Sequence, residues 1–318
     1  MAEFQQDAYA NGGPIMTKKA IVDLCMKHDL YRTPAVNDKL YLHSQGFRRI
    51  DPEVMGLYTG LRCLWLQQNG LAAIDGLEKC VELRNLCLHE NCIDEMRGMD
   101  TLVDLDSLNI SRNFLKKIEG LGKCQKLTNL NVGQNNIGPD VDAIESVLEI
   151  PGLQTLDLQG NRLEDGEAVL GMLKKMPQLR VVYCQGNPFV KDFRHYRKRF
   201  ISECRELRYL DDRPVFEDER RRATAWAAKL PEGLDAANEA ERAEIAQIRA
   251  DKKAAEEKRV RDFEIFIADA RATKATTDAK KGLTFSGERV TDPLADENAD
   301  PNAPPPPPPA FVDVDELD

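Results

Sequence analysis

The sequence predicts an α/β solenoid, with short parallel strands on the concave face of a stack of coils and 3₁₀ or α-helical segments on the convex face. The first observation is a pattern, L-x-x-L-x-L-x-x-N or a close variant, that starts at six leucines: Leu61, Leu83, Leu105, Leu127, Leu153 and Leu179. The second is its period, because the closing asparagines are 22, 22, 22, 26 and 26 residues apart, spacings typical of leucine-rich repeats. The third is composition, since 318 residues with 42% apolar side chains can bury a sizeable core.

The spacing within one repeat has a physical reason. The leucines of L-x-L lie on the same face of a strand, and the asparagine follows where the chain must turn. A buried turn needs hydrogen-bond partners for its backbone groups, and an asparagine amide supplies both donors and an acceptor. We therefore expect a structural ladder of six asparagines: Asn69, Asn91, Asn113, Asn135, Asn161 and Asn187.

The convex segments should differ with repeat length. The two longest repeats have apolar residues at helical spacing, so we expect α-helices within 140–151 and 165–177. The 22-residue repeats are too short for an α-helix and should form tight 3₁₀-like segments. Cys80 and Cys124 occupy the last inward position of their repeats and are expected to be core thiols.

Atypical elements flank the repeats, as the open ends of a solenoid require. Residues 1–15 are expected to be disordered, and 16–39 to contain a capping helix. The repeats fill 40–187, beginning with a degenerate copy in which Gln45 stands in place of the asparagine. Residues 188–230, with several aromatic side chains, should form the cap at the other end.

The C-terminal part of the chain is charged. Residues 231–281 are rich in Ala, Glu, Lys and Arg and are expected to form an extended helix. Its apolar residues hold no heptad over three repeats, so a solvated single helix is favoured over the alternative, a coiled coil. Residues 282–318 carry nine acidic side chains against one arginine, with six prolines at 304–309. We expect a disordered acidic tail, its prolines a spacer or a polyproline II ligand.

Charge and motifs exclude several classes of function. The tail accounts for −8 of the net charge of −10, so the rest of the chain is nearly neutral and lacks the basic footprint of a nucleic-acid binder. No apolar run reaches the roughly 18 residues of a membrane span, no signal peptide is evident, and the eight cysteines contain no C-x-x-C. We expect a cytosolic protein with free thiols and no membrane association.

No pattern of catalytic or metal-binding residues is present either. Phosphate-binding loops, H-E-x-x-H and G-x-S-x-G are all missing from the sequence. His43 and His89 occupy equivalent positions two repeats apart, roughly 10 Å, which is too far for one zinc ion to bridge. We expect no enzyme activity, no metal and no cofactor.

The concave surface remains as the candidate protein-binding site. The residue between the two strand leucines should point outward, and these residues are Tyr41, Trp65, Cys87, Asn109, Asn131, Asp157 and Tyr183. Two positions further on lie His43, Gln67, His89, Ser111, Gly133, Gln159 and Gln185. A largely uncharged face with aromatic ends suits a protein partner, with Trp65 and Tyr41 as expected anchors. The basic cluster at 194–199 is interpreted as the outer face of a cap helix, with binding of acidic tails such as tubulin's as the alternative.

Longer segments carry a resemblance to known proteins. The 22-residue repeat resembles the subfamily typified by the yeast regulator of protein phosphatase one and the outer-arm dynein light chain. More specific segments are LYLHSQGF (40–47), YTGLRCLWLQQNG (58–70), YLDDRPVF (209–216) and AWA (225–227). These are similar to the axonemal dynein assembly factor 1 family of ciliated cells, and the resemblance runs from Met16 to about Leu230.

The resemblance implies a cytoplasmic scaffold, associated with cilia or flagella, for the preassembly of dynein arms. Its implied partners are axonemal dynein heavy and intermediate chains, other assembly factors and heat-shock chaperones, and we expect a monomer. Two alternatives remain open: a stable light-chain-like subunit of the axoneme, and a scaffold that regulates a phosphatase. All three functions are those of a binding protein.

Overall fold

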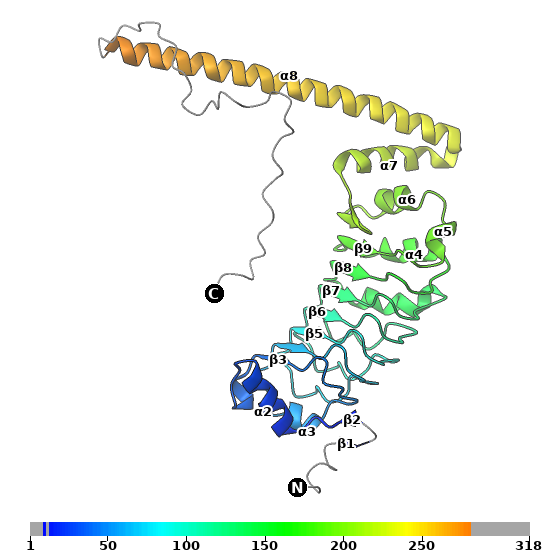
Figure 1. Ribbon diagram of the computed structural model, residues 1–318. Helices are drawn as coiled ribbons and strands as arrows, with labels where there is room; N and C mark the ends of the chain where they lie inside the picture. Colours follow the sequence, from blue (N-terminus) through cyan, green and yellow to red (C-terminus); the bar gives the residue numbers. More distant parts are fainter. Residues whose placement is uncertain (1–8, 11–12, 281–318) are drawn as a thin grey trace, which may run out of the picture. The chain divides into compact units, whose positions relative to one another are not determined.

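The computed structural model of the chain describes residues 9–10 and 13–280 (Figure 1). Its contacts divide the chain into one unit that ends at Asp251 and a second that begins at Lys252. The tail predicted at 282–318, with its proline run, lies outside the described residues, as do residues 1–8 and 11–12. The described helices include none long and apolar enough to cross a membrane.

Short parallel strands, one per coil, form the concave face of the first unit (Figure 1). In the described part of the chain, nine strands form one sheet in the order β11-β10-β9-β8-β7-β6-β5-β4-β3. They are β3 (Lys39–Tyr41), β4 (Cys63–Trp65), β5 (Asn85–Cys87), β6 (Ser107–Asn109), β7 (Asn129–Asn131), β8 (Thr155–Asp157), β9 (Val181–Tyr183), β10 (Tyr209–Leu210) and β11 (Arg213–Pro214). Neighbours pair in parallel except β10 and β11. The leucine-rich-repeat solenoid predicted from the repeat pattern is confirmed.

Each repeat strand places its central side chain in a core that runs the length of the stack. These residues face one another across neighbouring strands and are almost fully buried: Leu40, Leu64, Leu86, Leu108, Leu130, Leu156 and Val182. Cys80 and Cys124 lie in the same core, and burial raises the pKa of each thiol to about 11. The repeated leucine pattern of the sequence thus produces one continuous hydrophobic core.

The six asparagines form a ladder that joins each coil to the one before it. The Nδ2 of Asn91 donates to the carbonyl oxygens of Leu66 (3.0 Å) and Leu88 (2.9 Å), and its Oδ1 accepts from the N–H of Leu71 at 3.1 Å. The same three kinds of bond recur at Asn69, Asn113, Asn135, Asn161 and Asn187. The amide therefore satisfies backbone groups that the turn would otherwise leave buried without partners.

The first long repeat does not form the α-helix expected within 140–151. Val141–Glu149 is a 3₁₀-helix, η2. Buried side chains recur here at every third residue, at Ile144 and Val147 in the helix and at Ile150 directly after it, and a helix with three residues per turn keeps such a row on one face. The second long repeat does form an α-helix, α4 (Gly166–Leu173), in which Asp165 caps the first turn.

The 22-residue repeats have separate turns on the convex side where 3₁₀ segments were expected. The N–H of Cys80 donates to the carbonyl of Leu77 (2.9 Å), and the N–H of Leu83 donates to that of Cys80 (3.1 Å). These bonds have 3₁₀ spacing, but the coil turns back toward the next strand before they join into a helix.

The N-terminal cap begins earlier than the sequence indicates. Its helices are α2 (Lys18–Lys27) and η1 (Pro34–Val36); α3 (Pro52–Met55) follows within the first, degenerate repeat, between β3 and β4. Thr17 Oγ1 caps α2 by accepting from the N–H of Ala20, and the helix buries Ile21 and Cys25. Part of the segment expected to be disordered, 1–15, is ordered, because β1 (Tyr9–Ala10) pairs with β2 (Gly13–Pro14). Pro14 lies against the first repeat, next to the backbone of Gly46.

The C-terminal cap is built around Trp226. Its helices are α5 (Phe189–Asp192), α6 (Tyr196–Glu203), α7 (Glu217–Lys229) and the 3₁₀ turn η3 (Leu230–Glu232). Trp226 lies on α7 and is fully buried, with its ring 4.8 Å from that of His195 and the Lys198 ammonium 5.3 Å from its centroid. Its Nε1–H donates to Asn238 Oδ1, on the helix that follows.

The sequence predicts a solvated charged helix, but α8 (Leu234–Lys280) is partly buried in its first part. Gly233, at φ 120°, turns the chain between η3 and α8, and Ala237 and Ile248 are buried. Arg221 of α7 pairs with Glu244 (2.7 Å) and Asp251 (2.9 Å). The part of α8 in the first unit therefore belongs to the cap. In the second unit, the described side chains from 252 to 274 are exposed apart from half-buried Ile267.

Candidate protein-binding surface

The seven candidate residues form one row across the concave face. The strand pairing places Tyr41 opposite Trp65, Trp65 opposite Cys87, and so on through the row, which continues with Asn109, Asn131, Asp157 and Tyr183. All seven side chains are half-buried. The second row, two positions further along each chain segment, lies beside it. The two rows differ in chemistry between the N-terminal and C-terminal halves of the sheet.

The N-terminal half is aromatic. The rings of Tyr41 and Trp65 stack with centroids 4.7 Å apart and planes at 22°. His28, from the end of α2, lies 5.4 Å from the Tyr41 ring and 6.1 Å from the His43 ring. Although Trp65 and Tyr41 stack on each other, both rings are only half-buried and stay accessible from the concave side.

Beside this stack, three polar atoms are buried without a hydrogen-bond partner among the described residues: His43 Nδ1, Gln67 Oε1 and His89 Nδ1. Burial lowers the pKa of His89, so its imidazole is neutral at pH 7. An unsatisfied buried polar atom costs about 1 to 3 kcal/mol, which a partner can recover by supplying the missing bond. We call Tyr41, His43, Trp65, Gln67 and His89 the N-terminal concave patch.

The C-terminal half satisfies its own polar groups. Asn109 Oδ1 accepts from the N–H and Oγ of Ser111, and Asn131 Oδ1 accepts from the N–H of Gly133. Gln185 Nε2 donates to Asp212 Oδ2 at 2.8 Å. In the two successive repeats of Asn109 and Asn131 the side chain therefore bonds within its own repeat, and these repeats offer a partner fewer unsatisfied polar atoms than the N-terminal concave patch.

Asp157 is less available than its position in the row predicts. Its Oδ1 accepts from the N–H of Gln159 at 2.9 Å, and the carboxylate packs beside Gly133. Burial raises the pKa of this carboxyl, against the lowering effect of that hydrogen bond. The group therefore fixes the end of β8, and replacing it with a larger side chain is expected to disturb the strand end.

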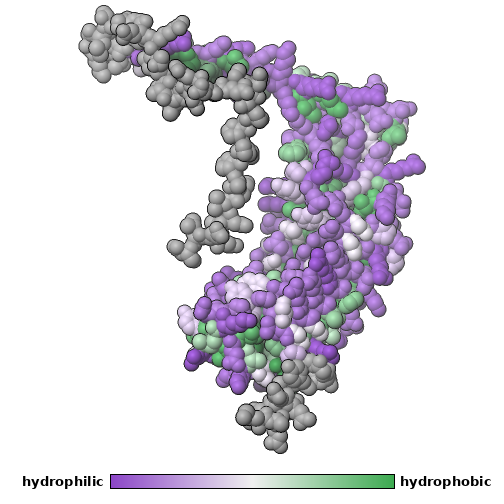
Figure 2. Space-filling model, viewed as in Figure 1, coloured by the Kyte–Doolittle hydropathy of each residue, from purple (hydrophilic) through white to green (hydrophobic). Residues whose placement is uncertain are grey.

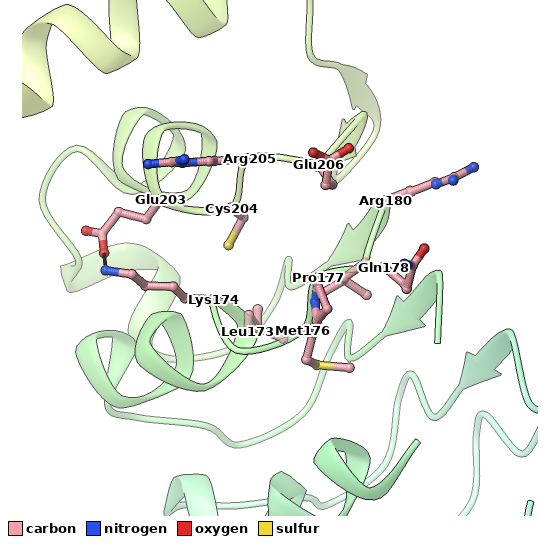
Figure 3. A pocket seen from close by; sticks show the side chains of 11 residues that line it. Leu173, Lys174, Met176, Pro177, Gln178, Arg180, Glu203, Cys204, Arg205 and Glu206 are labelled. Carbon is pink, nitrogen blue, oxygen red and sulfur yellow. Dashed lines mark hydrogen bonds and ion pairs between the residues drawn. The ribbon is translucent and has the colours of Figure 1, made fainter. Parts of the chain in front are cut away.

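A pocket of about 560 Å³ lies at one edge of the solenoid, between the turns that precede β9 and β10 (Figure 3). Leu173, Met176 and Cys204 line it, and the ion pair of Lys174 with Glu203 (3.2 Å) spans one side. Burial raises the pKa of the Cys204 thiol to about 11, so at neutral pH it is protonated and a poor nucleophile. The pocket is a gap between stacked turns with no reactive group arranged in it.

Relatives of this chain share its repeats over most of its length. The leucine-rich repeat family pattern matches residues 98–239. The leucine-rich repeat-containing protein ODA7 of Chlamydomonas reinhardtii is 47% identical over 285 residues, 90% of this chain and 62% of that protein. Dynein axonemal assembly factor 1 is 54% identical over 222 residues in Mus musculus and 55% identical over 214 residues in Homo sapiens. Over most of its length the chain is thus similar to dynein axonemal assembly factor 1 and related leucine-rich-repeat proteins.

The match to this family is partial in length. The human and mouse family members align with 67% and 70% of this chain, which corresponds to 29% and 34% of their own length. Among solved structures, a leucine-rich-repeat protein of Leptospira interrogans matches with a TM-score of 0.46 at 22% identity, over 58% of this chain and 46% of that one. The likeness to dynein axonemal assembly factor 1 rests on the sequence relatives.

The basic cluster at 194–199 makes ion pairs within the C-terminal cap. Arg197 makes a bidentate ion pair with Glu219 and donates to the carbonyls of Leu210 and Pro214. Lys198 pairs with Glu241 of α8, and Arg199 pairs with Glu167 of α4. Three of the charges thus join the cap helices to each other and to the last repeats. They lie in the cap, as expected, but they are half-buried between its elements and do not form an outer face.

A second ladder, which sequence reasoning missed, runs beside the asparagines. The residue before each asparagine has a positive φ, and its side chain bonds to the equivalent side chain of the next coil. The ladder runs through Ser44, Gln68, Glu90, Arg112 and Gln134. Gly160 and Gly186 hold the same position in the later repeats and also have positive φ. Those two glycines are the sequence signal for a left-handed residue at this point.

The free cysteine thiols allow a test of which residues lie in the core. At pH 8 a thiol-alkylating reagent is expected to modify exposed Cys92 rapidly in the native protein. Cys80, Cys124 and Cys204, whose thiol pKa values burial raises to about 11, are expected to react only on unfolding. Mass spectrometry of the alkylated protein over time measures both rates. Equal rates for Cys92 and Cys124 would contradict the assignment of the core.

The described residues contain no group of three or more His, Cys, Asp or Glu side chains placed to hold a metal ion.

Proposed function

We propose that this chain is a non-catalytic scaffold in the cytoplasmic preassembly of axonemal dynein, and that it binds its protein partner through the N-terminal concave patch. The names of its relatives, which are axonemal dynein assembly factors, support the biological process. The partners we infer are axonemal dynein heavy or intermediate chains, with other assembly factors or chaperones. The scaffold acts as a monomer, without a cofactor, in cells that build cilia or flagella.

One contrast supports the choice of surface. The two halves of the concave face have the same backbone but differ in their polar groups. In the C-terminal half, first-row side chains accept hydrogen bonds from Ser111, Gly133 and Gln159 of the second row. In the N-terminal half, His43 Nδ1, Gln67 Oε1 and His89 Nδ1 are buried without a partner among the described residues. The same half carries the Tyr41–Trp65 stack, a large apolar area with polar edges. A partner that covers the stack can also supply the missing hydrogen bonds, so both features favour the same surface.

The test is Trp65→Ala in the full chain, expressed in ciliated cells that lack their own copy. Loss of an aromatic anchor at the centre of an interface costs about 2 kcal/mol or more, so co-precipitation of dynein heavy and intermediate chains is expected to fall about 30-fold. Dynein arms, counted by electron microscopy of cross-sectioned cilia, are expected to be reduced in parallel.

Phe114→Ala is the matched control, because Phe114 is an exposed aromatic residue outside the two concave rows. It is expected to behave like the unchanged protein in both assays. Melting temperatures of both variants should stay within a few degrees of wild type, since neither residue lies in the core. Normal recovery of dynein chains by Trp65→Ala would show that the partner binds another surface.

A further inference from the structure

A group of apolar side chains lies on one face of α8, in the second unit. Val260, Phe263 and Phe266 are 49%, 63% and 66% exposed, and Figure 2 shows an apolar area on this helix. At about 100° per residue, these three side chains and Ile267 fall within about 120° of the helix circumference. We call Val260, Phe263, Phe266 and Ile267 the α8 stripe.

Neither helix stability nor folding accounts for the α8 stripe. Val, Phe and Ile have lower helix propensity than the Ala, Glu, Lys and Arg that fill the rest of this segment. An exposed apolar side chain also contributes none of the burial energy that such residues supply in a core. Among residues 252–274, four of the five large apolar side chains belong to the α8 stripe, and the fifth, Ile265, lies on the opposite face. This concentration of largely exposed apolar side chains on one face indicates contact with another molecule.

We propose that the α8 stripe is a second docking element, which inserts into an apolar groove on a protein partner. Val260, Phe263 and Ile267 have the i, i+3, i+7 spacing by which an amphipathic helix occupies such a groove. The stripe spans the eight residues from Val260 to Ile267, about 10 Å of helix, so a groove that holds two helical turns encloses it.

A second copy of this chain does not fit the stripe. A coiled coil requires apolar residues at both core positions over three to four heptads. Continuing the heptad of Val260 and Phe263 along the helix places Lys253, Glu256 and Lys274 at core positions. The apolar seam therefore ends after less than two heptads, whereas the walls of a groove can surround a short stripe.

The charge of the helix disfavours a membrane surface. Helices that bind at a lipid interface carry Lys and Arg over their polar face. Residues 252–274 contain seven basic and five acidic side chains, and the acidic ones include Asp262, Glu264 and Asp269, close to the stripe. A polar face with both basic and acidic side chains suits the polar rim of a protein–protein interface, where charges of either sign can form ion pairs.

Site-specific photocross-linking in the full chain tests the proposal. The probe is p-benzoylphenylalanine, introduced singly in place of Val260, Phe263 or Ile267 in cells that are assembling motile cilia. The matched control is the same probe at Ile265, which is 54% exposed and lies on the opposite face of the helix. We expect the three stripe positions to cross-link to residues lining an apolar groove of one and the same polypeptide, and Ile265 not to do so.

Substitutions give a second measurement on the same helix. Phe263→Glu is expected to lower recovery of the cross-linked polypeptide about 30-fold, and Ile265→Glu to leave it near wild type. Repeating the cross-linking with Trp65→Ala separates this element from the N-terminal concave patch, because the stripe cross-links should persist. Equal cross-linking at 263 and 265, no cross-link at any stripe position, or cross-links only to lipid or to a second copy of the chain would each overturn the proposal.

Discussion

Asn113→Ala is expected to destabilise the repeat domain by about 3 to 5 kcal/mol, because it leaves several buried backbone groups without partners. The Asn113 amide donates to the carbonyls of Leu88 (3.0 Å) and Ile110 (3.1 Å). It donates to Ser111 O (3.0 Å), and its Oδ1 accepts from the N–H of Ile93 (2.9 Å). Urea unfolding followed by far-ultraviolet circular dichroism measures the change in the free energy of unfolding.

Asn129→Ala is the matched control for the ladder. Asn129 is exposed on β7 and its amide donates only to the neighbouring hydroxyl of Thr128, at 2.9 Å. Surface substitutions of this kind change stability by about 0.5 kcal/mol or less. A free energy of unfolding for Asn113→Ala as close to wild type as that of Asn129→Ala would mean that the ladder contributes little to stability.

The repeats could be predicted because their information is local and periodic. Leu64, Leu86 and Leu108 need only the alternation of a strand to be assigned to the core, and the structure buries all three. The 3₁₀-helix at Val141–Glu149 was predicted wrongly as an α-helix, although apolar residues at every third position are visible in the sequence. A period of three, read strictly, favours 3₁₀ over α.

The division of the concave face also has a local cause. Asn109, Asn131 and Asp157 accept a hydrogen bond from the N–H two residues further on, as short Asn and Asp side chains commonly do in turns. Tyr41 and Trp65 cannot make this bond. The local hydrogen bonds of the C-terminal half of the concave face can thus be predicted from the sequence. The burial of the unpartnered atoms in the N-terminal half depends on neighbouring coils, so it appears only in the structure.

The return of the chain onto the cap could not be predicted from composition. Residues 231–281 read as a uniformly charged helix, yet Glu244 and Asp251 pair with Arg221, 23 and 30 residues earlier. These ion pairs form only because the chain turns back at Gly233. Local helix propensity does not specify the direction in which α8 leaves that turn. The cap therefore includes a helix that a sequence reading places in solvent.

Trp226→Ala is expected to release the first part of α8 from the cap. Trp226 is fully buried on α7, and its indole N–H donates to Asn238 Oδ1 at 3.3 Å. Truncation of a buried tryptophan costs about 3 to 5 kcal/mol, and at one end of a solenoid that loss appears as local opening. Hydrogen exchange measured by mass spectrometry should show lost amide protection in 217–251 and retained protection in the strands β4 to β7.

Trp226→Phe separates ring packing from the hydrogen bond. A phenyl ring keeps much of the contact with His195, whose ring centroid lies 4.8 Å away, but it has no N–H to offer Asn238. The net contribution of one such bond is about 1 kcal/mol, so protection over 234–251 should fall only slightly. If Trp226→Ala leaves exchange over 234–251 unchanged, α8 is held by the ion pairs of Lys198 and Arg221 rather than by the tryptophan.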